Sequence, residues 1–303
     1  MKFFGTVAAF GKSKTERLTI SAPTLATLTC EEPRNNGVVQ HEQRKTDGSG
    51  FQFMSDLHLE LRREYRTYAI PVEAPYLILA GDVGKLCDRD DYLHFLRRMC
   101  SQYERVLLVP GNHEFWGTFR SKASDIVEHF EHELGDKFVW MDRRRIDFEN
   151  GKTIVLGCTL YSHVPLGLDT AEIMDFQKIG DWDIVSHNTA HQADRDWLKT
   201  QLAIVKQSSP LSRVIVATHY APSYKNTADP RHPDTSRKHF FCSDLLTEFQ
   251  GWAGADQVTH YIFGHTHWNT VFTWGPTTIL SNQRSQNGIG PKQDRDFDLK
   301  ASI

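Results

Sequence analysis

The stretch RVLLVPGNHEFWG (105–117) joins a short apolar run to a turn that carries Asn112 and His113. Leucine and β-branched residues in such a short run are typical of a strand buried on both faces. Four other apolar runs end in the same way, with SDLHLE after FQFM, GDVG after YLILA, THYAPS after RVIVA, and GHTHW after THYIF. Because ligands of open α/β sheets bind outside the carboxyl ends of the strands, we expect these five loops to converge on one site.

Apolar runs along the chain predict strands at 51–54, 76–80, 105–109, 153–160, 213–217, 259–263, 270–274 and 277–280. Between them, apolar residues recur at a helical period in 90–103, 121–134 and 191–205. Strands that alternate with helices predict an α/β fold with helices on the faces of the sheet. The last runs lie close together in the sequence, which indicates antiparallel pairing there.

The five loops supply imidazole, carboxylate and amide groups, and no thiolate. The residues are Asp56, His58, Asp82, Asn112, His113, His219, His265 and His267. This donor set favours manganese, iron, zinc, cobalt or nickel over copper(I) or an iron–sulfur cluster. It is too large for one ion and fits two ions about 3.5–4 Å apart that share a bridging carboxylate. Two such ions outweigh the two aspartate charges, so the site should attract an anion, and phosphate esters are the natural candidates.

The spacing of the candidate ligands supports this interpretation. Two pairs of ligands are separated by one residue, Asp56 with His58 and His265 with His267. In an extended segment, residues two apart point to the same side, so each pair would aim two ligands into one cleft. Three glycines are expected to permit tight turns where side chains would crowd the metals: Gly81, Gly111 and Gly264.

Each motif alone is a weak signal. A lone histidine such as His219 is more often a surface residue or a hydrogen-bonded core residue than a metal ligand. Five motifs in a row, each directly after an apolar run, favour a metal site over coincidental turn residues.

The order D-x-H, GD, GNHE, H and GHxH resembles the calcineurin-like metallophosphoesterase superfamily over residues 51–284. The resemblance implies a four-layer α/β/β/α double β-sandwich. It also implies a ligand set: Asp56, His58 and His267 for one metal, Asn112, His219 and His265 for the other, and Asp82 bridging them. A metal-bridging hydroxide would be the nucleophile, and His113 would contact the phosphate and act as the general acid.

The implied activity is hydrolysis of a phosphate monoester or diester (EC 3.1.-.-) with two divalent or trivalent ions, manganese, iron or zinc. Ser/Thr phosphoprotein phosphatases carry glycine directly after D-x-H and an Asp-Arg-Gly run after GD. Here these positions read LE and VGKL, so the arginines that bind phosphate in that branch are missing. The chain therefore looks closer to the phosphodiesterase-like branch. Two alternatives stay open, a catalytically silent metal-binding scaffold and a Ser/Thr protein phosphatase.

A long segment interrupted by proline, 223–244, follows the strand that ends at His219. Long loops near an active site often determine specificity. Arg237 and Lys238 are therefore candidates for binding the substrate, with a solvated surface loop as the alternative.

The composition is that of a globular protein, with 39% hydrophobic residues and a net charge of −3, so we expect no nucleic acid polymer as a partner. The resemblance to metallophosphoesterases implies a small phosphorylated substrate instead. Five scattered cysteines without a CxxC pair favour a reducing compartment, and we expect a cytoplasmic protein. No apolar run reaches the ~18 residues of a membrane span.

Residues 1–50 read as a polar, flexible extension and 51–303 as the metallophosphoesterase domain, with a polar tail from about 285. The sequence does not indicate the oligomeric state.

Overall fold

The computed structural model describes residues 50–148, 152–231, 235–284 and 297–303. The extension predicted for residues 1–50 therefore lies outside the described residues, apart from Gly50. Most of the predicted polar tail, residues 285–296, also lies outside them.

The helices and strands follow one another along the chain as an α/β pattern. In chain order they are β1 (Phe51–Met54), β2 (Tyr76–Leu79), α1 (Arg89–Gln102), β3 (Arg105–Leu108), α2 (Ala123–Leu134), β4 (Phe138–Trp140), β5 (Arg144–Phe148), β6 (Thr153–Cys158), α3 (Asp175–Lys178), α4 (Ile184–Ser208), β7 (Arg213–Thr218), α5 (Leu245–Phe249), β8 (Val258–Phe263), β9 (Val271–Trp274) and β10 (Thr277–Ser281).

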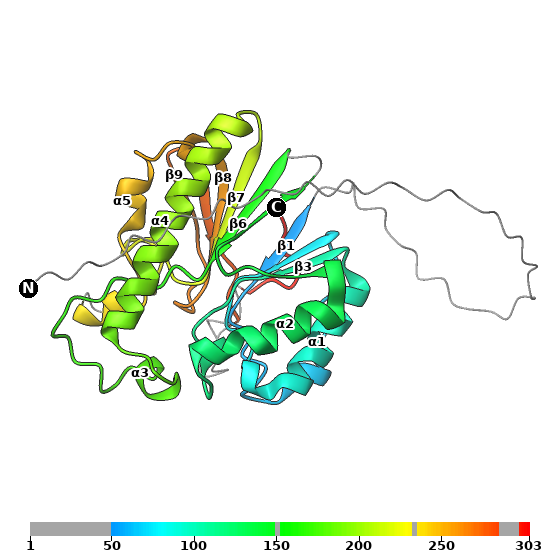
Figure 1. Cartoon of the computed structure of the whole chain (residues 1–303). Helices are drawn as coiled ribbons and strands as arrows, with labels where there is room; N and C mark the ends of the chain where they lie inside the picture. The colour runs from blue at the N-terminus through cyan, green and yellow to red at the C-terminus, as the bar shows by residue number, and fades with distance from the viewer. Residues whose placement is uncertain (1–49, 149–151, 232–234, 285–296) are drawn as a thin grey trace, which may run out of the picture. The chain divides into compact units, whose positions relative to one another are not determined.

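The strands form two sheets (Figure 1). The first has the order β1-β2-β3-β4 and is parallel throughout. The second has the order β5-β6-β7-β8-β10-β9, and only its two edge strands pair antiparallel to their neighbours. The antiparallel pairing expected near the end of the chain is therefore found between β9 and β10.

Three apolar clusters define the layers. One joins the first sheet to α1 and α2 and includes Leu77, Leu96 and Phe130. A second joins the other sheet to α4 and α5. The third lies between the two sheets and contains Ile78 and Leu107 from one and Ile215 from the other. The order is helix, sheet, sheet, helix, which confirms the predicted four-layer α/β/β/α sandwich (Figure 1).

All eight predicted strands and all three predicted helices are present, but two strands were missed. β4 has three residues, too short for a periodic signal. β5 reads RRIDF and is only partly buried, because it is an edge strand with charged side chains. Helix α4 also begins earlier than predicted, at Ile184, where the Asp183 side chain caps it by accepting from the Ser186 N–H.

The last residues of the chain contact the first sheet. Ile303 and Phe51 exchange two backbone hydrogen bonds of 2.9 Å, and Ser302 forms an antiparallel bridge with Gln52. The side chains of Ala301 and Ile303 pack against the cluster between the sheets. The polar composition of the preceding segment gave no sign of this contact.

In the described part of the chain the four cysteines are free. Among the same residues, no helix has the length and apolar character that a membrane crossing requires.

The close approach of the sheets at Gly157 generates a stability prediction. A Cβ atom on this β6 residue would lie 2.7 Å from the Cβ of Met141, which belongs to the other layer. We expect Gly157→Ala to lower the free energy of unfolding by about 1–3 kcal/mol, the usual cost of overpacking a core. Urea unfolding measures the change. Gly251→Ala is the control, since its Cβ would meet nothing closer than 3.4 Å; equal stability of both variants would contradict the prediction.

Candidate metal centre

The five loops predicted to converge do meet, at the carboxyl ends of strands from both sheets. β1, β2 and β3 of the first sheet are followed by the loops with Asp56, Asp82 and Asn112, while β7 and β8 of the second lead to His219 and His265. Backbone hydrogen bonds fasten neighbouring loops, from Asp56 N–H to the Gly81 carbonyl (3.0 Å) and from Gly264 N–H to the His219 carbonyl (2.9 Å). The His265 N–H donates to both carboxylate oxygens of Asp56 at 3.1 Å, which joins the two sheets at the site.

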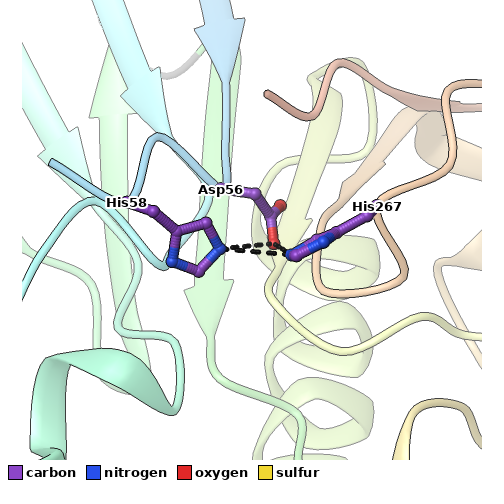
Figure 2. Close-up of side chains that lie close together, drawn as sticks. All are labelled: Asp56, His58 and His267. Atoms are coloured by element: carbon purple, nitrogen blue, oxygen red, sulfur yellow. Dashed lines mark hydrogen bonds and ion pairs between the residues drawn. The ribbon is translucent and has the colours of Figure 1, made fainter. Parts of the chain in front are cut away.

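Asp56, His58 and His267 form one group of potential ligands (Figure 2). Their ligand atoms all lie within 4.8 Å of one another. Nε2 of His267 is 3.3 Å from Oδ1 of Asp56 and 3.1 Å from Nε2 of His58. Two imidazoles and a carboxylate therefore point at the same small volume.

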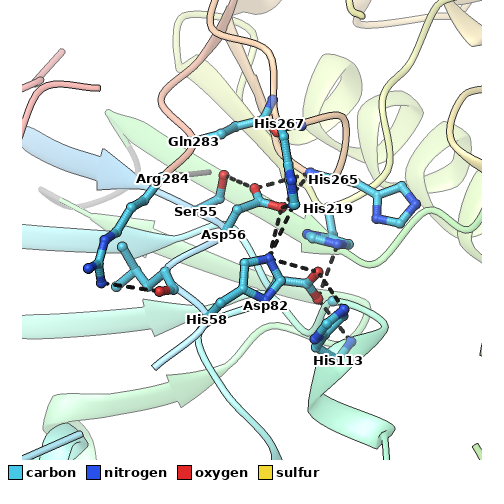
Figure 3. Close-up of polar contacts among 12 residues, drawn as sticks. Ser55, Asp56, His58, Asp82, His113, His219, His265, His267, Gln283 and Arg284 are labelled. Atoms are coloured by element: carbon cyan, nitrogen blue, oxygen red, sulfur yellow. Dashed lines mark hydrogen bonds and ion pairs between the residues drawn. The ribbon is translucent and has the colours of Figure 1, made fainter. Parts of the chain in front are cut away.

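Asp82, His219 and His265 form a second group with the same mutual spacing. Nε2 of His219 is 3.3 Å from Oδ1 of Asp82 and 3.0 Å from the amide oxygen of Asn112. The other oxygen of Asp82 faces the first group, 3.8 Å from Nε2 of His58 (Figure 3). The Asp82 carboxylate thus lies between the two groups with one oxygen toward each.

His113 lies beside the first group and is paired with a residue that the sequence analysis missed. Its Nδ1 is 2.9 Å from Oε1 of Glu60, which also lies 3.4 Å from Nδ1 of His58. These three residues form a further set with metal-ligand spacing, but it shares His58 with the first group. Glu60 is already engaged with both imidazoles, so hydrogen bonding accounts for this set without a third ion.

Burial and charge perturb the titration of the site. Burial alone would lower the pKa of His219, but the adjacent Asp82 carboxylate outweighs it and raises that pKa to about 10. Burial lowers the pKa of His265 to about 3, with His219 contributing in the same direction. Burial would raise the pKa of Glu60, yet its hydrogen bonds with His113 and His58 bring it down to about 2.

The backbone at the ligands is not extended, which corrects the reason given for their spacing. The φ angles are 54° at Asp56, 45° at His58, 53° at Asp82, 72° at His265 and 51° at His267. All five lie in the left-handed region, where aspartate and histidine are enriched among residues other than glycine. The paired ligands converge because each occupies a left-handed turn position after a strand.

Gly264 is required for a close approach. Its φ is not among the positive ones, so a left-handed turn does not explain it. A Cβ on Gly264 would lie 2.7 Å from Oδ2 of Asp56 and 2.8 Å from Oγ of Ser55. Any larger residue would push the His265 loop away from the first sheet.

Glu114, the last residue of GNHE, is a second residue that the sequence analysis left without a role. One carboxylate oxygen accepts the N–H groups of Asp82 (2.9 Å) and Gly111 (2.7 Å). The other accepts those of Val83 and Gly84 and the hydroxyl of Tyr92. Burial and the charge of Asp82 raise the pKa of Glu114 to about 7, against the effect of its donors. This side chain fixes the GD loop to the GNHE loop.

The two candidate substrate cations lie on the 3-10 helix Ser236–Phe240 and have other partners. Arg237 forms an ion pair of 2.5 Å with Glu172, and the Lys238 ammonium lies 4.9 Å from the ring centre of Tyr224. The same segment borders the site through Phe241, whose ring centre is 5.2 Å from that of His265. Their role in substrate binding stays a prediction.

The four-layer sandwich gathers imidazoles and carboxylates at the ends of its strands, with the spacing of metal ligands. The chain belongs to the calcineurin-like phosphoesterase family, whose model matches residues 51–269. This confirms the resemblance inferred from the five motifs, and with it the general expectation of a phosphoesterase hydrolase; the phosphodiesterase-like branch stays a prediction. Members of this family usually use divalent metal ions, in keeping with the His and Asp groups found here.

The proteins similar to this chain include one from a virus and one from a bacterium. "Uncharacterized protein L509" of Acanthamoeba polyphaga mimivirus is 22% identical over 284 residues, which is 82% of this chain and 96% of that protein. The crystal structure of phosphopantetheinyl hydrolase (PptH) from Mycobacterium tuberculosis superposes with a TM-score of 0.58 at 16% identity, covering 81% of this chain and 91% of the other. At this identity the likeness supports the fold alone.

The hydrogen bonds of Glu114 predict a sensitive variant. Glu114→Gln keeps the shape but turns an NH₂ group toward backbone N–H donors, leaving buried donors unsatisfied. We expect the free energy of unfolding of the metal-free protein to fall by roughly 1–3 kcal/mol, with weaker metal binding in addition. Denaturant unfolding and calorimetric titration with Mn²⁺ measure the two effects. Glu128→Gln, at an exposed position of α2, is the matched control; no difference between the variants would refute the role of Glu114.

Proposed function

We propose that this protein is a dinuclear metal-dependent hydrolase of phosphate esters. Asp56, His58 and His267 would hold one ion, and Asn112, His219 and His265 the other. The observation that carries the proposal is the Asp82 carboxylate between the two groups, with Oδ1 3.3 Å from His219 and Oδ2 3.8 Å from His58. A carboxylate with one oxygen toward each group is the arrangement that a bridging ligand needs.

The chemistry of the donors fits such ions. Imidazoles, carboxylates and one amide oxygen suit manganese, iron or zinc. Asp56, Asp82 and His219 are almost fully buried, so their polar atoms face one another rather than solvent. Burying two carboxylates this close together is costly, and bound cations would offset part of that cost. When bound, the ions would neutralise charge on the phosphate and acidify a water molecule.

The chain's own residues would then position and protonate the substrate. Oε1 of Glu60 accepts from Nδ1 of His113, which fixes the imidazole and leaves its Nε2 on the side of the site, 3.9 Å from Oδ2 of Asp82. A proton on Nε2 can pass to the oxygen of the leaving alcohol as its bond to phosphorus breaks. His113 would therefore act as the general acid.

The substrate we propose is a small phosphorylated molecule, a monoester or a diester. A silent scaffold would be expected to lack part of the ligand set, whereas the eight candidate residues of the five loops lie close together here. The absence of the phosphate-binding arginines after D-x-H and GD argues against a Ser/Thr protein phosphatase.

The bridging role of Asp82 predicts a loss of both metal and turnover. With Mn²⁺ the wild-type protein should bind two ions per chain and hydrolyse bis(4-nitrophenyl) phosphate or 4-nitrophenyl phosphate, and a chelator should abolish the reaction. Asp82→Asn should lower turnover at least ~10²-fold and weaken the binding of both ions. Asp125→Asn on the exposed side of α2 makes the same chemical change away from the site and should behave as wild type. A wild-type protein that binds no metal and hydrolyses neither ester would refute the proposed function.

The role of His113 predicts a dependence on the leaving group. His113→Ala should retain two bound ions while kcat for an alkyl ester falls by ~10²–10⁴-fold. The loss should be smaller for a 4-nitrophenyl ester, whose leaving oxygen needs less help from a proton. Steady-state kinetics with the two esters gives the comparison. Loss of one bound ion in this variant would instead identify His113 as a ligand and contradict its role as the acid.

A further inference from the structure

Asp175, the first residue of α3, lies far from the five motifs in sequence but reaches the metal centre. Its carboxylate is buried, with the residue 5% exposed. Oδ1 accepts from the Asn112 amide nitrogen at 2.7 Å and from the Trp116 indole nitrogen at 2.8 Å, while Oδ2 accepts from the Tyr220 hydroxyl at 3.1 Å. One carboxylate thus receives hydrogen bonds from three side chains, two from the loop after β3 and one from the loop after β7.

The bond to Asn112 decides which end of the amide faces the second group. An amide has one oxygen that can bind a cation and one NH₂ group that cannot. With its nitrogen held by Asp175, the oxygen of Asn112 points at Nε2 of His219, 3.0 Å away. Without that acceptor, rotation by half a turn would present the NH₂ group to the ion.

The bond to Trp116 reaches the candidate general acid. The Trp116 indole is stacked on the imidazole of His113, with ring centres 3.5 Å apart and an interplanar angle of 25°. The oxygen that orients Asn112 therefore also fixes the ring against which His113 rests.

The backbone holds Asp175 in this place. The Gly117 N–H donates to the Lys178 carbonyl at 2.8 Å, and the Gly180 N–H donates to the Thr118 carbonyl at 2.9 Å. These bonds join the carboxyl end of α3 to the residues that follow GNHE, and so restrict the position of Asp175 relative to Asn112.

We propose that Asp175 is a positioning residue that orients Asn112 toward the second metal and steadies His113 through Trp116. This inference rests on the proposed function, because it assigns Asn112 to a metal. Partners of this kind behind a metal ligand typically contribute about 10–100-fold to metal affinity or activity.

The decisive experiment compares variants of the full chain by calorimetric titration with Mn²⁺. Asp175→Ala removes the acceptor, and we expect the affinity for one ion to fall about 10–100-fold while the other is unchanged. Asp175→Asn should be close to wild type, since its oxygen can still accept from Asn112 and Trp116 while its nitrogen donates to the Tyr220 hydroxyl. This rescue tests orientation rather than charge.

Two further variants separate the arms of the carboxylate. Tyr220→Phe removes only the donor to Oδ2 and should bind both ions as wild type does. Trp116→Phe removes the indole N–H but keeps an aromatic ring, and should lower kcat without changing the number of bound ions.

The outcomes distinguish this inference from the proposed function. Wild-type metal binding and turnover in Asp175→Ala would overturn the inference alone. A loss of metal affinity in Asp175→Asn or Tyr220→Phe as large as that in Asp175→Ala would do the same. A drop in the melting temperature of metal-free Asp175→Ala, with both ions weakened alike, would mark a merely structural role and overturn it too. A wild-type protein that binds fewer than two ions would overturn the proposed function, and this inference with it.

Discussion

The carboxylate of Glu114 is the constraint on which the rest of the site depends. Loops at the ends of neighbouring parallel strands turn their backbone N–H groups inward, and these donors need an acceptor where water is excluded. Glu114 accepts four of them from the GD and GNHE loops. The Asp82 carboxylate in turn accepts from the His113 N–H at 2.9 Å, so the bridging position is fixed by the loop that also carries Asn112. A single buried side chain thereby sets the separation of residues that serve both ligand groups.

The second constraint is steric and operates between the sheets. Gly264 lets the loop after β8 approach Asp56 closely, and the His265 N–H then donates to that carboxylate. The left-handed backbone at the ligands is an unfavourable conformation for most residues, and it persists because such contacts hold it in place. The geometry of the ligands is thus built into the chain by hydrogen bonds and close packing.

Much of the fold could be predicted because buried strands leave a direct trace in apolar runs such as RVLLV, and the polar residue after each run marks the end of the strand. β5 was not predicted because the charged residues of RRIDF, which suit an edge strand, leave no apolar run. The partners of the ligands were harder to find. Glu60 and Glu114 lie inside the motifs, but each also forms hydrogen bonds with residues of another loop, which the sequence does not reveal. Asp175 follows no apolar run, and its contact with Asn112 exists only once the chain has folded.

The layered architecture has a thermodynamic consequence. Each proposed ligand group takes residues from both sheets, with Asp56 opposite His267 in one and Asp82 opposite His219 in the other. Bound ions would therefore act as cross-links between the two halves of the sandwich. Because ions that bind only the folded chain stabilise it, tighter ion binding would also make the two sheets harder to separate.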